Sequence, residues 1–205
     1  MITVRRESLI VAMVSSVGGL DALGRVLTGL PADLPAAVIA LQHAEPARVS
    51  HLAGILDRTA PLPVTDARDG AVLAPGRVVV APSGFHTLVT RDRTVALVPS
   101  GRRPPYRPSA DLLLATLAAT AGPEAITVVL SGFGNDGAAG VTAVKRLGGT
   151  VIASDLATSQ QTSMPEAAID TGQVDHVLPL DDVARALIES RRSRRGIAVR
   201  DIVRG

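Results

Sequence analysis

The stretch LIVAMVSSVGGLDALGRVL, residues 9–27, decides the fold. Its first six residues are all apolar, as expected of a strand that is buried on both faces. The glycines at 18–19 allow a tight turn, and a stretch of helical spacing follows from Gly19 to Leu27. A buried strand joined by a short turn to a helix is the repeating unit of a parallel α/β sheet.

The same alternation continues along the chain. Apolar runs predict further strands at residues 37–41, 77–81, 126–130, 150–153 and 174–178. The stretches between them predict helices at 49–59, after an N-cap at Ser109, at 138–147, from Pro165 and at 181–192. Residues 86–90 and 94–98 alternate about a central turn and predict an antiparallel hairpin. We therefore predict a three-layer, doubly wound α/β fold with a mostly parallel sheet and this small hairpin.

The totals fit one globular domain. The chain has 205 residues, of which 46% are hydrophobic and 20% charged, and neither an interdomain linker nor an internal repeat is evident. We predict a single domain over 1–205, with a core at about 9–190 and a basic tail at 191–205. That tail carries six arginines: Arg191, Arg192, Arg194, Arg195, Arg200 and Arg204.

Composition excludes several function classes. The absence of cysteine rules out disulfides and thiolate nucleophiles and fits a cytoplasmic location, which we expect. No apolar stretch is long enough to span a membrane. Aromatic residues make up only 1% of the chain, so we expect no nucleic-acid partner. Metal-ligand spacing and the glycine signatures of nucleotide binding are also missing, so no metal or cofactor is expected.

Three polar clusters follow three predicted strands: residues 15–19, 42–43 and 131–137. In a parallel sheet the carboxyl ends of the strands share one edge, so these clusters should meet there. Together they supply the hydroxyl of Ser16, the imidazole of His43 and the carboxylate of Asp136, the groups of a Ser-His-Asp triad. Taken singly, each residue has a plainer interpretation: a helix cap, an exposed strand end or a turn. The G-x-S-x-G signature of α/β-hydrolases is absent.

Six segments around these clusters carry a more specific signal. In chain order they read VAMVSSVGGLDAL, LQHAEP, APGRVVVAPSGFH, YRPSADLL, LSGFGNDGAAG and MPEAAI. In this order they resemble the catalytic domain of the CheB-type chemotaxis methylesterases, over residues 9–187 approximately. Those enzymes usually have a receiver domain as well. We find no such segment before Leu9, so we expect the catalytic domain alone.

The resemblance implies roles for individual residues. Ser16 corresponds to the nucleophile, His43 to the general base and acid, and Asp136 to the residue that orients the imidazole. The amide of Val17 is implied as an oxyanion donor, with a second donor near Phe133. The implied reaction is hydrolysis of glutamate methyl esters on the signalling helices of chemoreceptors, with deamidation of some glutamines as a further activity.

The resemblance also bears on the partner. Receptor signalling helices are acidic coiled coils, and three arginines lie on the loop at residues 99–108. We expect Arg102, Arg103 and Arg107 to steer such helices to the site, although a solvated Arg-rich loop would have the same composition.

Two departures from the family pattern matter. The family usually has a threonine after the nucleophile, where this chain has Val17, and a methionine where it has Phe133. One lost hydrogen bond of about 0.5–1.5 kcal/mol would slow the reaction by up to about tenfold. Two alternatives therefore stay open: a catalytically weak module that binds a receptor or regulator, and a general hydrolase of small esters.

Overall fold

The fold is built on one parallel sheet of seven strands. The computed structural model describes residues 8–101 and 106–190, and the expected basic tail lies outside these residues. The strands lie in the order β3-β4-β2-β1-β7-β8-β9 and all pair in parallel. Their bounds are β1 Leu9–Ser15, β2 Ala36–Gln42, β3 Val64–Asp66, β4 Arg77–Val80, β7 Ala125–Val129, β8 Thr150–Ser154 and β9 His176–Leu178.

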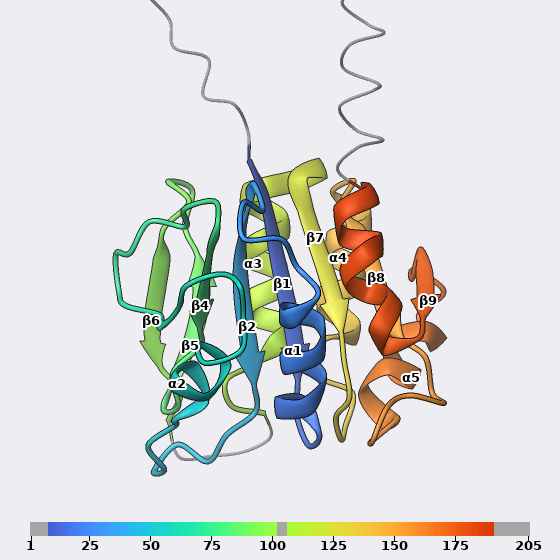
Figure 1. The fold of residues 1–205 in the computed structure, drawn as a ribbon, viewed down its shortest axis with the longest axis horizontal. Coiled ribbons are helices and arrows are strands. Elements are labelled where there is room, and N and C mark those ends of the chain that lie inside the picture. The colour runs from blue at the N-terminus through green and yellow to red at the C-terminus, as the bar shows by residue number, and fades with distance from the viewer. Residues whose placement is uncertain (1–7, 102–105, 191–205) are drawn as a thin grey trace, which may run out of the picture.

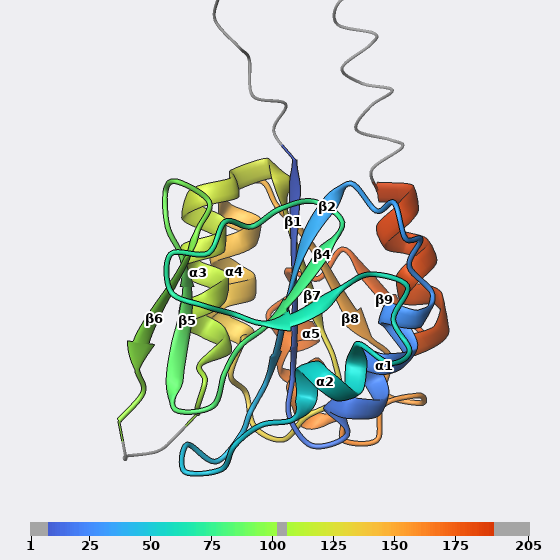
Figure 2. The same cartoon turned by 60° about the vertical axis from the view of Figure 1, so that its left-hand side comes forward.

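Helices cover both faces of this sheet, so the fold has three layers. One face carries α1 (Gly19–Thr28), α2 (Leu52–Leu56) and a closing helix that includes residues 183–190. The other carries α3 (Ala110–Ala121), α4 (Ala138–Arg146) and α5 (Ser163–Asp170). In Figure 2 the sheet separates α3 and α4 from α1 and α2. The predicted three-layer α/β class is confirmed.

Alternate residues of the central strands pack into two hydrophobic cores, one on each face of the sheet. In β1, Val11 and Met13 belong to the core on the α1 side, whereas Ile10, Ala12 and Val14 belong to the core on the α3 side. Successive side chains of a strand point to opposite faces, and both faces here are covered. This explains why the strand reads as an unbroken apolar run.

The predicted hairpin is present as β5 (Phe85–Val89) paired in antiparallel fashion with β6 (Val95–Pro99). It forms a separate two-stranded sheet, drawn at the left of Figure 1, and lies beside α3 in Figure 2. Thr120 ties the two together, because its hydroxyl donates to the carbonyl oxygens of Val89 and Thr90.

Two elements differ from the prediction. The short strand β3 was not predicted. Only Val64 of its three residues is buried, so the sequence shows no apolar run or alternation there. The helix expected at 49–59 is only α2, Leu52–Leu56. The Ser50 hydroxyl accepts the amide of Leu52 and holds the chain in a turn before this helix.

The strand order places a crevice at the centre of the sheet. From β1 the chain moves to β2 on one side and later returns to β7 on the other. Ligands of open α/β sheets bind where the strand order reverses in this way, beyond the carboxyl ends of the strands. Within the described residues, no helix has the length and apolar character needed to cross a bilayer.

Candidate active site

Ser16 lies at this reversal point, in the turn between β1 and α1. Its amide donates to the carbonyl of Ser131 at the end of the neighbouring strand, at 3.0 Å, and its own carbonyl accepts the amide of Gly19. Gly18 has a φ of +81°, which an L side chain rarely adopts. A side chain at Gly19 would collide with the Ser15 hydroxyl. The glycine pair therefore permits the tight turn that leaves Ser16 at the strand end.

His43 follows the neighbouring strand β2 and reaches the same edge. Its amide donates to the carbonyl of Ser15 at 3.0 Å, which continues the β1–β2 pairing by one residue. Its Nε2 lies 2.8 Å from Oδ2 of Asp136. The ring nitrogen left for Ser16 is thus Nδ1, the reverse of the arrangement in which Nδ1 faces the aspartate.

Ser16 and His43 line one cavity of about 290 Å³, together with Ala44, Glu45, Tyr106, Arg107 and Phe133. Among the described residues, no hydrogen bond joins the Ser16 hydroxyl to the imidazole. Such contacts are often long in the absence of substrate. The structure thus brings the three predicted residues to one edge and bonds two of them.

Asp136 is buried at the N-terminus of α3. Its carboxylate accepts hydrogen bonds from the amides of Ala110 (2.6 Å) and Asp111 (3.0 Å) and from the hydroxyl of Ser109 (3.2 Å). Burial works to raise the pKa of Asp136, but hydrogen bonds from His43 and from these amides outweigh it and lower the pKa. Asp136 is therefore ionised at neutral pH.

The start of α4 is held by a carboxylate in the same way. Oδ1 of Asp111, in the first turn of α3, accepts the amides of Gly137 (2.9 Å) and Gly140 (2.7 Å). Burial raises the pKa of Asp111, and these two amides oppose it only in part. Asp136 precedes α4 and caps α3, whereas Asp111 belongs to α3 and caps α4. We call this arrangement the carboxylate exchange.

Two polar residues support the site without having been predicted. The buried Ser131 donates from Oγ to the carbonyl of Val17 and accepts the amide of Gln161, both at 2.9 Å. It therefore links the Ser16 turn to the loop before α5. His86, on the hairpin, accepts the amide of Ser109 at Nδ1, at 3.0 Å. Ser131 lies within a predicted cluster, but its partners are too distant in sequence to be inferred.

The two backbone amides predicted to bind an oxyanion have no hydrogen-bond partner within the described residues. Those of Val17 and Phe133 make no hydrogen bond in the part of the chain that the structure describes, whereas the amide of Gly132 donates to Gln161. The side chains of both residues are exposed, and Phe133 lines the cavity. A role for these two amides in binding an oxyanion remains a prediction.

Tyr106 is a further cavity residue that was not predicted as part of the site. Its ring stacks on that of His43, with centroids 5.3 Å apart. The sequence contains one signal for it, because Tyr106 is the only tyrosine of the chain and lies in one of the quoted segments.

Of the three predicted arginines, Arg107 lines the cavity, where its Nη1 also donates to the carbonyl of Gly101. Arg102 and Arg103 lie outside the described residues. No group of three or more His, Asp or Glu side chains in residues 8–101 and 106–190 is arranged to hold a metal ion.

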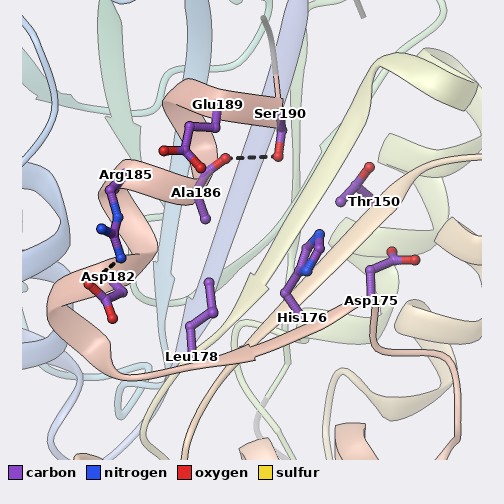
Figure 3. A pocket seen from close by; sticks show the side chains of 9 residues that line it. All are labelled: Thr150, Asp175, His176, Leu178, Asp182, Arg185, Ala186, Glu189 and Ser190. Atoms are coloured by element: carbon purple, nitrogen blue, oxygen red, sulfur yellow. Dashed lines mark hydrogen bonds and ion pairs between the residues drawn. The ribbon is translucent and has the colours of Figure 1, made fainter. Parts of the chain in front are cut away.

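A wider cavity, of about 660 Å³, lies between the closing helix and the edge strand β9 (Figure 3). It shares no residue with the Ser16 cavity. Its charged side chains are largely paired, Asp182 with Arg185 and Asp175 with Lys145. None of the three predicted catalytic residues, Ser16, His43 and Asp136, lines it.

Comparisons with known proteins identify the family that the chain resembles. The family model described as CheB methylesterase matches residues 11–187. A protein-glutamate methylesterase/protein-glutamine glutaminase of Moorella thermoacetica is 42% identical over 183 residues, which cover 87% of this chain and 43% of that protein. One from Myxococcus xanthus is 42% identical over 190 residues, covering 91% and 55%. The chain thus spans about half the length of these curated relatives.

A solved structure is also similar. The crystal structure of the Thermotoga maritima CheB methylesterase catalytic domain superposes with a TM-score of 0.84 at 36% sequence identity. The match covers 89% of this chain and 98% of that one. Sequence and fold therefore point the same way, and the chain belongs to the CheB methylesterase family.

Proposed function

We propose that this chain is a serine hydrolase that removes methyl esters from glutamate side chains of chemoreceptor-type proteins and also deamidates some of their glutamines. The observation that carries the proposal is a single cavity that presents the Ser16 hydroxyl beside an imidazole held by a buried, ionised carboxylate. We also propose that residues 9–190 form one catalytic domain, which acts in the cytoplasm.

The reaction would proceed by acyl transfer. Ser16 Oγ attacks the ester carbonyl while Nδ1 of His43 takes its proton. The amides of Val17 and Phe133 donate to the oxyanion, a contribution worth roughly 10²–10³ in rate for each donor. The protonated His43 then gives its proton to the departing methoxide, which leaves as methanol. A water molecule, activated by the same imidazole, hydrolyses the acyl-enzyme to glutamate.

Asp136 would act through His43 rather than on the substrate. Because its pKa is lowered, it stays ionised throughout the cycle and stabilises the imidazolium that forms when Ser16 loses its proton. Its four hydrogen-bond donors leave the carboxylate little freedom to turn.

The cavity fits a small reacting group on a large partner. Its volume of about 290 Å³ suits one glutamate methyl ester side chain. Arg107 at its rim offers a positive charge to an acidic helix. Specificity would then come from docking of the helix around the cavity.

The test is release of methanol from a methylated receptor fragment. Ser16→Ala and His43→Ala should each lose at least about 10³ in rate, since both act in the same proton transfer. Ser100→Ala is a matched serine control: within the described residues its buried hydroxyl has no hydrogen-bond partner, so its removal should change neither fold nor rate. Equal rates for the parent and Ser16→Ala would end the proposal.

One observation favours a second function. Val17 offers no hydroxyl, and the Ser16 hydroxyl makes no hydrogen bond within the described residues, as expected of a catalytically weak module that binds receptors. Saturable receptor binding without labelling by a serine-reactive probe would support that function. Turnover of simple aryl esters, with no effect of added receptor helices, would instead indicate a general esterase.

A further inference from the structure

Tyr106 covers one face of the His43 ring. The two rings are nearly parallel, with an interplanar angle of 18° and centroids 5.3 Å apart. Both side chains line the Ser16 cavity. The stack is therefore part of the site itself.

The hydroxyl of Tyr106 fixes the other end of this side chain. It donates to Oδ1 of Asn135 at 3.0 Å and accepts the amide of the same residue at 3.4 Å. A Cβ built on Gly134 would lie 2.5 Å from the Tyr106 hydroxyl oxygen, so the loop packs against the phenol with no room for a side chain. Asn135 immediately precedes Asp136. Tyr106 thus connects the imidazole to the loop that carries its carboxylate partner.

The stack adds a restraint that the carboxylate does not supply. A hydrogen bond to Nε2 fixes that nitrogen but lets the ring turn about the bond. Nδ1 points steadily toward Ser16 only if the plane of the ring is fixed as well. A cation held over an aromatic face also gains electrostatic energy from the ring. The protonated imidazole would gain this energy, and the neutral one would not.

We propose that Tyr106 is a positioning residue, which sets the plane of the His43 imidazole and stabilises its protonated form during turnover. The proposal rests on the proposed function for its kinetic consequence. Its structural part, the coupling of the two rings, can be tested without any substrate.

The kinetic test compares two substitutions. Tyr106→Phe keeps the stacked ring and loses only the bond to Asn135, so kcat should stay within about threefold of the parent. Tyr106→Leu fills similar space without a π face, and its kcat should fall roughly tenfold or more, with a smaller change in KM. A Leu variant as active as the parent, or a Phe variant as slow as the Leu variant, would overturn the proposal.

The second test uses fluorescence. The chain has one tyrosine and no tryptophan, so the tyrosine emission of the whole protein comes from Tyr106. A protonated imidazole in contact with a phenol quenches its emission more than a neutral one. Emission should therefore fall when the pH is lowered far enough to protonate the imidazole.

The controls assign this titration to His43. Within the described residues, the other charged side chains that contact the ring or line its cavity are Asp136, Glu45 and Arg107. The pH dependence should disappear in His43→Asn, or in His43→Gln if the first variant is poorly folded, and should persist in Glu45→Gln. An unchanged titration without His43, or none in the parent, would overturn the coupling. Failure of methanol release alone would contradict the proposed function and leave the coupling intact.

Discussion

Among the glycines close to Ser16, Gly132 has the least room for a side chain. Its amide donates to the carbonyl of Gln161 and its carbonyl accepts the amide of Met164, at 3.0 and 2.9 Å. A Cβ at this position would collide with Sδ of Met164 and would lie 2.8 Å from Cβ of Ser16. Neighbours on both sides thus require a glycine.

Gly132→Ala should accordingly damage both stability and activity. The added methyl group must push Met164 or Ser16 aside, and we expect a loss of about 1–3 kcal/mol in the free energy of unfolding, together with slower methanol release. Urea denaturation and the methylated receptor assay measure the two effects. Gly54→Ala is the matched control, because nothing lies within 4 Å of its new Cβ. Equal behaviour of the two variants would show that the pocket around residue 132 is looser than described.

The sequence patterns predicted the sheet edge at which the site lies, but only some of the side-chain contacts within it. The strand-end positions of Ser16, His43 and Asp136 follow from the apolar runs before them, and the structure brings all three to one edge; their catalytic roles remain a prediction. The stack of Tyr106 on His43 joins residues 63 positions apart (106 − 43), through side-chain geometry alone. Strand periodicity predicts which edge a residue reaches, but not what its side chain contacts across that edge.

At the scale of elements, β7 contains one polar group that its surroundings do not satisfy. All five residues of this central strand are buried, and the hydroxyl of Thr127 has no hydrogen-bond partner in residues 8–101 and 106–190. A buried polar group in this state costs about 1–3 kcal/mol. The strand is therefore less stable than its packing allows.

Thr127→Val should raise the free energy of unfolding by about 1 kcal/mol, because a methyl group of similar size replaces the unsatisfied hydroxyl. Thr120→Val is the opposite case, since that hydroxyl donates to two hairpin carbonyls and its loss should destabilise the fold. Thermal or urea unfolding of the two variants measures the difference. A destabilised Thr127→Val would indicate a water molecule or another partner at this hydroxyl.

The same scale explains which elements could be predicted. Strands β1, β2 and β7 are buried on both faces and leave unbroken apolar runs in the sequence. Strand β3 is short and mostly exposed, so its presence was not evident from the sequence. Helix α2 begins only after the turn at Ser50, so its length was not evident either. Buried elements have a recognisable apolar pattern in the sequence, whereas edge strands and capped helix ends have almost none.

For the whole molecule, the carboxylate exchange links stability to pH. The lowered pKa of Asp136 means that its stabilising contribution is complete above its ordinary value of 3.8 and is lost as the pH falls through the lower pKa of the folded state. Asp111 acts in the opposite sense, because its pKa is raised: its contribution is present at low pH and lost as the pH rises through the folded-state value.

Asp136→Asn should therefore be less stable than the parent at neutral pH by about 2 kcal/mol, the value of a hydrogen-bonded charge. The difference should shrink as the pH is lowered below 3.8, where the parent loses the same charge. Urea unfolding at a series of pH values from 7 to roughly 3 measures it. The exposed Asp33→Asn is the control and should track the parent throughout. A difference that stays constant with pH would show that Asp136 is not stabilised as an ion.

The carboxylate exchange also limits how this site can be engineered. Asp136 depends on amides of α3, and the loop that carries it depends on Asp111 of the same helix. Grafting the G-N-D-G loop onto another scaffold would transplant a carboxylate without its donors. A functional transplant would have to include α3, α4 and the loop before α4 together, because neither helix can be replaced without the other.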